Sequence, residues 1–278
     1  MKTARRLVPL VAALLLAACG RGGPAAEARP PLWRVSDGDT TVWLLGSIHL
    51  LPANVHWRTP AVERAIAESR ELVLESSPDD SADFAGMASG ADLPPLAARV
   101  PAALRPALDA TMKRSGVAAA TLDRRKSWAA AATLATGQAV AAGASARHGV
   151  ERILWDDFAG RYRAAFHRAA DQVRALDALP AAMQDRMLVA ALDPGQSYAA
   201  TLRAWEQGDL AALARTDADP VLGEQLVVGP NRRWSRWVAA WMRRPGVVLV
   251  AVGAGHLAGA DSLPAMLARQ GLKVERVE

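Results

Sequence analysis

The sequence predicts an α/β fold in which both ends of the chain form a central mixed sheet and a large helical insertion lies between them. Each end carries the same pattern: an apolar strand followed by Gly-x-x-His-Leu, a helix and a second strand. The roughly 150 residues between these units are rich in alanine and leucine and have helical periodicity. Such a fold buries its sheet by bringing the first and last segments of the chain together.

The N-terminal residues predict export and lipid attachment. Positive residues at 2, 5 and 6 precede an apolar run at 7–16, and Cys19, the only cysteine, follows two alanines. This run is too short to span a membrane, and the segment resembles a bacterial lipobox. The resemblance implies cleavage before Cys19 and its modification by diacylglyceryl and a further acyl chain such as palmitate. The alternative is an ordinary secretory signal with an incidental cysteine.

These features divide the chain into three parts. Residues 1–18 are expected to be a lipoprotein signal peptide, residues 19–31 a flexible tether rich in glycine and proline, and residues 32–278 the folded domain. We therefore expect an exported protein held to a membrane through Cys19. Gly20 replaces the aspartate that resembles an inner-membrane retention signal, which favours the outer membrane, facing the periplasm of a Gram-negative cell.

The composition excludes several classes of function. Without residues 1–18 the chain has 30 Lys+Arg and 28 Asp+Glu, a net charge near +2, and no contiguous basic stripe with interleaved aromatic residues. Nucleic acid is therefore not a predicted partner. With Cys19 lipidated, no thiol remains for a disulfide, a metal ligand or a nucleophile.

The first repeated unit is predicted from short apolar runs. Residues 32–35 and 41–45 form a β-hairpin around the turn Asp37-Gly38-Asp39. The apolar spacing of residues 60–68 predicts a helix, and residues 71–75 return to a strand. The second unit repeats this order, with a buried strand at 247–252, a helix at 263–270 and a last strand at 272–277.

The segment between the units, from Leu93 to Met242, is expected to be helical with breaks at proline and glycine. In its last helix Trp234, Trp237 and Trp241 share one face, with arginines around them. We expect these tryptophans to pack against the sheet. Docking of this helix on anionic lipid headgroups is the alternative.

Two histidines and one glutamate are the candidate functional residues. His49 and His256 follow predicted strands at the edge where open α/β sheets bind ligands, and Glu75 ends its strand at the same edge. Gly46 and Gly253 permit a tight turn or a close approach of the backbone to a bound group such as a cofactor. Two imidazoles and a carboxylate can hold a divalent metal ion with one position open to water, which predicts a metal site with hydrolytic chemistry. The alternative is that each histidine only caps the end of a strand.

The chain also resembles the TraB/GumN family, relatives of the Tiki metalloproteases. The motifs that carry the resemblance are the two Gly-x-x-His sequences, the strand ending at Glu75, Lys126-Ser127-Trp128, Asp177-Ala178-Leu179-Pro180, Trp205-Glu206-Gln207-Gly208-Asp209, and Asn231 ahead of Trp234. The resemblance implies a fold related to erythromycin-esterase-like and haem-binding ChaN-like proteins. It further implies a divalent-metal peptidase in which His49, His256 and Glu75 are catalytic and bind the metal. Zinc, manganese and cobalt are the candidate metals, and a peptide or an envelope component is the candidate substrate.

Two positions depart from the family pattern. Relatives often have a second glutamate where this chain has His167, and an arginine where it has Pro230. His167 either replaces that glutamate, which would favour zinc, or is a partly solvated helix residue. The departures leave a second hypothesis open, a non-catalytic envelope lipoprotein that binds haem, metal or an envelope polymer. His56 and His148 are expected to be solvated or capping residues.

Overall fold

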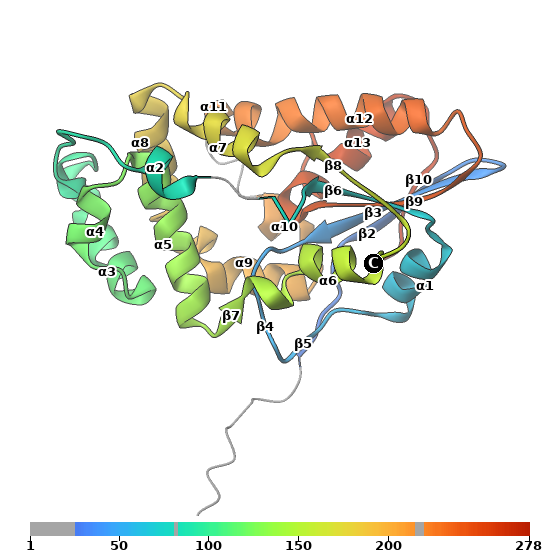
Figure 1. The fold of residues 1–278 in the computed structure, drawn as a ribbon, viewed down its shortest axis with the longest axis horizontal. Helices are drawn as coiled ribbons and strands as arrows, with labels where there is room; N and C mark the ends of the chain where they lie inside the picture. Colours follow the sequence, from blue (N-terminus) through green and yellow to red (C-terminus); the bar gives the residue numbers. More distant parts are fainter. Residues whose placement is uncertain (1–25, 81–82, 215–219) are drawn as a thin grey trace, which may run out of the picture.

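The computed structural model describes residues 26–80, 83–214 and 220–278. The predicted signal peptide and the lipidation site at Cys19 lie outside these residues. Figure 1 shows a central sheet with helices on both faces and a lobe of helices at one end. In the described ranges no helix is long and apolar enough to cross a membrane. The mixed α/β class predicted from the sequence is confirmed.

The central sheet has the strand order β10-β2-β3-β9-β6-β8 in the part of the chain that the structure describes. Its strands are β2 (Leu32–Ser36), β3 (Thr40–Ser47), β6 (Glu71–Ser76), β8 (Tyr162–His167), β9 (Gly246–Gly253) and β10 (Val274–Arg276). The strands β3, β9, β6 and β8 run parallel, whereas β2 is antiparallel to β3 and β10 is antiparallel to β2. Both ends of the fold therefore contribute to one mixed sheet, as predicted.

The two Gly-x-x-His units are adjacent in this sheet. β3 pairs with β9 from Thr40 opposite Gly246 to Ser47 opposite Gly253, and β6 pairs with the other edge of β9. Parallel strands end at the same edge of a sheet, so the loops after β3 and β9 and the end of β6 lie together. The prediction that these strands are neighbours is confirmed.

Two hydrophobic cores cover the two faces of the sheet, because successive side chains of a strand point to opposite faces. Trp43 and Leu45 of β3 belong to the first core, and Val42 and Leu44 to the second. The first core is completed by α1 (Pro60–Glu68), α6 (Val150–Asp157), α9 (Tyr198–Glu206) and α10 (Leu210–Leu213), and the second by α12 (Gly229–Trp241) and α13 (Leu263–Arg269). Trp234 is buried in the second core, which confirms that α12 packs against the sheet.

Side-chain caps determine where the helices that follow the two Gly-x-x-His loops begin. Thr59 accepts a hydrogen bond from the backbone N–H of Val62 at the start of α1, and Ser262 accepts one from Ala265 at the start of α13. Both helices also have proline in the first turn, where its missing N–H needs no partner.

The helical lobe is built from segments between the two units. Its helices are α2 (Phe84–Ala88), α3 (Arg105–Ser115), α4 (Ala119–Asp123), α5 (Ser127–Ala141), α7 (Ala169–Asp177), α8 (Ala181–Ala190) and α11 (Pro220–Gly223). Helix α5 is central to the lobe and packs against α3 and α8 through leucine side chains, including Leu108, Leu134 and Leu188. In Figure 1 this lobe extends from the end of the sheet where the Gly-x-x-His loops leave it.

Two predictions about local structure are wrong. Residues 162–167 form strand β8 rather than part of a helix, because pairing with β6 outweighs the helix preference of the two alanines in this segment. The expected tether does not extend through residues 26–31. Strand β1 (Ala26–Glu27) pairs with β5 (Val55–His56), and Ala28 is buried in the first core. A second short pair joins β4 (Leu51–Pro52) to β7 (Ala144–Ser145).

Candidate functional site

The first residue of each Gly-x-x-His motif lies where two segments approach closely. A Cβ atom on Gly46 would lie 3.2 Å from the Cα and Cβ atoms of Ala254, in the 3-10 helix η7 (Ala254–Leu257) that follows β9. The carbonyl oxygen of Gly46 accepts a hydrogen bond of 2.8 Å from the indole Nε1 of Trp205 in α9. A Cβ atom on Gly253 would lie 3.6 Å from both a Glu75 oxygen and the His256 ring. Both glycines therefore let backbone and side chains converge at the site, as the sequence suggests.

Asn231 holds the imidazole of His256 in one tautomer. The Asn231 amide nitrogen donates to two backbone carbonyls, those of His256 (3.2 Å) and Asp261 (2.9 Å). Its oxygen must then be the atom 2.9 Å from His256 Nδ1, so that Nδ1 carries the proton and donates it. The other ring nitrogen, Nε2, keeps a free lone pair.

Burial keeps His256 neutral. His256 is 9% exposed, and its ring packs against that of Trp234 with centroids 4.6 Å apart. Burial is the main cause that lowers the pKa of His256 below its ordinary value; Glu75 opposes this effect, and the charges of His167 and His49 lower the pKa further. A neutral, correctly oriented imidazole is the form that binds metal ions.

Glu75 extends from β6 into the space beside His256 and is also buried, at 7% exposed. Its Oε1 accepts a hydrogen bond of 3.0 Å from the side-chain amide of Gln172 in α7, and its Oε2 accepts one of 3.3 Å from the backbone N–H of Gly253. Oε2 also lies 3.8 Å from Nε2 of His256. These two atoms are both acceptors, so this arrangement is favourable only with a proton or a cation between them.

His49 forms a different pair, with Glu151 of α6. Its Nδ1 lies 2.8 Å from Oε1 of Glu151, and the hydroxyl of Ser47 donates to the same oxygen. Glu151 is 6% exposed, and its second oxygen, Oε2, is buried without a hydrogen-bond partner. Burial alone would raise the pKa of Glu151, but the charge and hydrogen bond of His49 and the hydroxyl of Ser47 together lower it. This carboxylate is therefore ionised at neutral pH.

The charge of Glu151 is the main cause that raises the pKa of His49 to about 9; burial opposes it, and the hydrogen bond to Glu151 and the charge of Glu75 add to it. His49 is thus protonated at neutral pH when no metal is bound. Its side chain is 58% exposed, and it lines a depression of about 360 Å³ together with Glu151 and Ser76. The histidine that faces solvent is therefore a cation, and the buried histidine is neutral.

We expect the metal-free chain to lose thermal stability as the pH rises from about 6.5 to about 9. The pKa of His49 in the folded state, about 9, exceeds its ordinary value of 6.5. Protonation of His49 therefore stabilises the fold fully below pH 6.5, and this contribution falls as the pH rises and is lost once the pH exceeds the folded-state pKa of about 9. Melting temperatures measured in EDTA across this range should fall for the parent chain and stay nearly constant for His49→Gln.

The matched control for this pH dependence is His56→Gln, since His56 is an exposed histidine on β5. This variant should keep the parent pH dependence. An unchanged slope in His49→Gln would show that another group titrates in this range.

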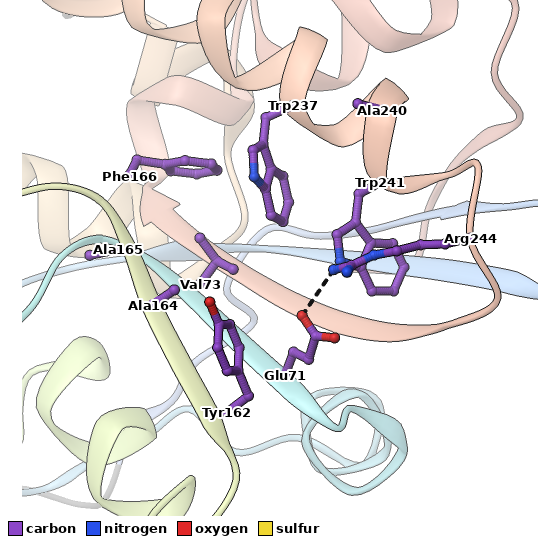
Figure 2. Close-up of a pocket in the computed structure, with 10 residues that line it drawn as sticks. All are labelled: Glu71, Val73, Tyr162, Ala164, Ala165, Phe166, Trp237, Ala240, Trp241 and Arg244. Atoms are coloured by element: carbon purple, nitrogen blue, oxygen red, sulfur yellow. Dashed lines mark hydrogen bonds and ion pairs between the residues drawn. The ribbon is translucent and has the colours of Figure 1, made fainter.

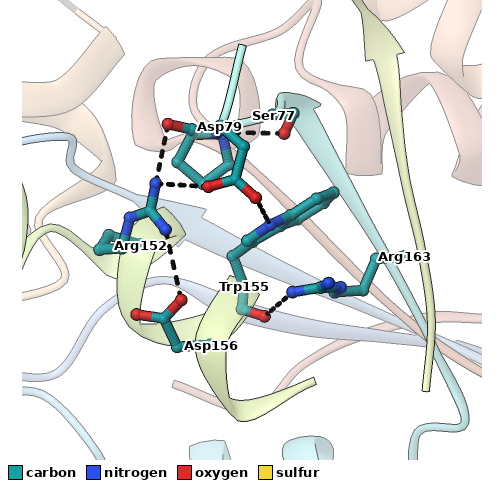
Figure 3. Close-up of polar contacts among 7 residues, drawn as sticks. Ser77, Asp79, Arg152, Trp155, Asp156 and Arg163 are labelled. Carbon is teal, nitrogen blue, oxygen red and sulfur yellow. Dashed lines mark hydrogen bonds and ion pairs between the residues drawn. The ribbon is translucent and has the colours of Figure 1, made fainter. Parts of the chain in front are cut away.

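A cluster of polar contacts holds the loop after β6 against α6, next to His49 and Glu151. Figure 3 shows Asp79 accepting hydrogen bonds from Arg152 (2.8 Å) and from the indole of Trp155 (2.6 Å). Arg152 also donates to the carbonyl of Pro78, and Arg163 of β8 donates to the carbonyl of Trp155 while lying over its ring. These contacts connect β6, α6 and β8 at one side of the site. They fix the wall of the depression that contains His49.

The structure brings two of the three predicted residues together. Glu75 lies beside His256, whereas His49 contacts Glu151, and the charge of Glu75 acts on both histidines. In the described part of the chain no group of three His, Cys, Asp or Glu side chains is placed to hold one metal ion. The three-residue ligand set of His49, His256 and Glu75 stays a prediction.

The two positions that depart from the family pattern both line a cavity of about 450 Å³ next to Glu75. His167 ends β8, and its Nε2 is buried without a hydrogen-bond partner. Pro230 lies in the first turn of α12, and Arg233, about one turn further, lines the same cavity. A cation is therefore present at this cavity although position 230 does not provide it. His56 is exposed, as expected. His148 ends a short 3-10 helix, but its Nδ1 is buried without a hydrogen-bond partner, so this nitrogen neither faces solvent nor caps the helix.

Glu151 and Gln172 are site residues that the sequence pattern does not reveal. Glu151 was hidden because an acidic residue in the first turn of a helix is common on solvated faces. Its spacing from Leu154 places both on the buried face of α6, which is an unusual position for a carboxylate and could have identified it. Gln172 could not be found in this way, because its approach to Glu75 depends on how α7 packs beside β6.

Comparison with known proteins gives one family. The family model described as the TraB/PrgY/gumN family matches residues 31–276. A search of curated proteins finds no match, and a search of solved structures finds none either. The match includes both Gly-x-x-His loops, the strand that ends at Glu75 and the helices around them. The chain therefore belongs to the TraB/PrgY/gumN family.

Proposed function

We propose that this protein is a metal-dependent hydrolase that cleaves peptides, with His256 and Glu75 at the centre of its site. One observation carries the proposal: two buried acceptors, Nε2 of His256 and Oε2 of Glu75, face each other at 3.8 Å. The tautomer set by Asn231 leaves the Nε2 lone pair free for a ligand. This donor set of one nitrogen and one oxygen fits a divalent ion such as zinc, manganese or cobalt.

His49 is the proposed third ligand, in agreement with the sequence pattern. Since it is protonated when it contacts Glu151, binding a metal there would release its proton. A bound divalent ion would supply Lewis-acid chemistry, polarising a carbonyl and making a bound water acidic near neutral pH. Gln172 and the N–H of Gly253 hold the Glu75 carboxylate in place for the role of a ligand or of a general base.

The surroundings of Glu75 suit part of a peptide. The cavity beside it is lined by aromatic and leucine side chains, among them Phe166, Trp234 and Leu176. Arg233 offers the one cationic guanidinium among the lining residues and can bind a carboxylate. An apolar cavity with a few convergent polar groups is typical of a substrate site.

The proposal extends to fold and location. We propose that the fold is related to the erythromycin-esterase-like and ChaN-like proteins, and that a lipid on Cys19 anchors the protein to the outer membrane, facing the periplasm. The lipobox resemblance supports the anchor. Replacement of Cys19 by serine should abolish incorporation of radiolabelled palmitate and release the protein from membranes.

Metal analysis of the purified full chain tests the metal proposal. We expect about one divalent ion per chain, lost in His256→Ala because the Nε2 ligand is removed. The control is His56→Ala, which removes an exposed histidine and should retain the metal. A metal content that is equal in both variants, or absent from the parent chain reconstituted with zinc, manganese and cobalt in turn, would contradict the proposal.

A binding protein without turnover is the second candidate. The pairing of His49 with Glu151 favours this candidate. It leaves only His256 and Glu75 as ligands for a metal ion, without the third ligand that the proposed hydrolase uses. Such a protein would bind metal, haem or an envelope polymer in the same cavity. Turnover of a mixed peptide library by the metal-loaded chain distinguishes the two, since only the hydrolase would produce new N-termini.

A further inference from the structure

Strand β8 forms the outer edge of the central sheet and has a free side. It follows β6 in the strand order, and β6 is its partner. In the described ranges no other segment makes a backbone hydrogen bond to residues 162–167. An edge strand with unpaired N–H and C=O groups is a template for another extended chain.

A groove lies beside this edge, between the outer strands and α12. It has a volume of about 590 Å³ and is shown in Figure 2. Tyr162, which is 63% exposed, forms one wall, and Trp237 and Trp241 form the other. Ala164 and Ala240 are small residues on facing walls, so the groove has room for an apolar side chain.

The groove adjoins the cavity that contains Glu75. Phe166 and Trp237 line both this groove and the cavity that contains Glu75. Their rings meet edge to face with centroids 5.3 Å apart and lie between the two hollows. A ligand that fills both hollows therefore runs along β8 toward its end at His167.

The length of this path matches a short extended peptide. It follows α12 from Pro230, beside the cavity, to Trp241, which lines the groove. At 1.5 Å per residue this distance is about 17 Å, which an extended chain covers with about five residues. Side chains at alternate positions of a strand point to the same face, so two of them can enter the two hollows.

We propose that an extended peptide with apolar side chains at alternate positions adds to β8 as a strand and leads its backbone to Glu75. The inference rests on the proposed peptidase function and specifies how that site selects its substrate. The free backbone edge is what favours a peptide over an acyl chain, which would use the groove but not the hydrogen-bonding groups of β8. At the end of the groove that lies away from Glu75, Arg244 and Glu71 form an ion pair of 3.1 Å. This end of the groove is therefore polar.

Binding to the full chain carrying Glu75→Gln tests this proposal without turnover. The probe is a fluorescein-labelled eight-residue peptide of alternating leucine and serine, measured by fluorescence anisotropy. Ala240→Trp fills the groove and should weaken binding at least tenfold. Arg236→Trp adds the same side chain at an exposed position of α12 outside the groove and should leave binding unchanged.

Two further measurements test strand addition itself. Only every second backbone N–H of an added strand faces β8. N-methylation of the amides that face β8 should weaken binding at least tenfold, and N-methylation of the amides that face away from it should leave binding unchanged. Equal binding of both N-methylated series would overturn strand addition. Tyr162→Ala, at an exposed position that does not threaten folding, should weaken binding several-fold and serves as a second groove variant.

The remaining outcomes separate this inference from the proposed function. Peptides that bind through the groove but are not cleaved by the parent chain would leave the inference standing and contradict the hydrolase. If the parent chain and Ala240→Trp cleave peptides equally well, the hydrolase proposal would stand and the inference about β8 would be contradicted. A dimer that light scattering detects and Ala240→Trp abolishes, with no peptide binding, would show that a second copy occupies the edge and overturn the inference.

Discussion

Glu75→Gln should lower peptide turnover by a factor of about one hundred or more, the size expected for loss of a general base or of metal-bound water chemistry. The carboxylate is buried between Gln172, Gly253 and His256, and its Oε2 is the oxygen that lies beside the His256 ring. The amide has the same shape and can still accept a hydrogen bond. The fold should therefore be retained, which circular dichroism and thermal melting would check.

The metal content of Glu75→Gln distinguishes two roles. A ligand role predicts weaker metal binding in the variant, and a general-base role predicts retained metal with lost turnover. Glu68→Gln is the matched control, since Glu68 is an exposed carboxylate at the end of α1 and should keep full activity. Full activity of Glu75→Gln would contradict both roles and favour the binding protein.

Trp205→Ala should lower the free energy of unfolding by about 3–5 kcal/mol, because it removes a large, fully buried side chain from the first core. It should also lower activity, since the Trp205 indole donates to the carbonyl of Gly46 and so holds the loop that carries His49. Urea unfolding monitored by circular dichroism would measure the first effect, and peptide turnover the second.

A pair of milder variants isolates the hydrogen bond of Trp205. Trp205→Phe keeps most of the packing but leaves the buried Gly46 carbonyl without its partner, at a cost of about 1–3 kcal/mol. Trp43→Phe is the matched control, because Trp43 is buried in the same core and its Nε1 has no hydrogen-bond partner. If the two variants lower stability and activity equally, the hydrogen bond to Gly46 has no separate role.

Much of the sheet could be predicted because its strands are continuous apolar runs. The strand at 247–252 is nearly all valine and leucine, and its repeated Gly-x-x-His ending identified β3 as its neighbour. Strand β8 could not be predicted in the same way. Its sequence, Tyr-Arg-Ala-Ala-Phe-His, has neither a continuous apolar run nor a strong alternation, and only pairing with β6 makes it a strand.

The candidate site was predictable in its strand-end residues but not in the residues that hold them. His49, His256 and Glu75 each follow or end a recognisable strand. Glu151, by contrast, reaches Ser47 and His49 from a helix about one hundred positions away. No spacing rule relates such residues, since their contact depends on how α6 crosses the end of β3.

The pairing of β3 with β9 also determines when in folding the site can form. Ser47 and Gly253 are partners although they are 206 positions apart. Closing so long a loop costs roughly 5 kcal/mol of chain entropy. Until β9 inserts, β3 and β6 each have a free edge, and His256 is absent from the site. Before β9 is in place, the candidate site is therefore incomplete, and the free strand edges make the chain prone to aggregate. The last central strand both completes the sheet and brings His256 to the candidate site.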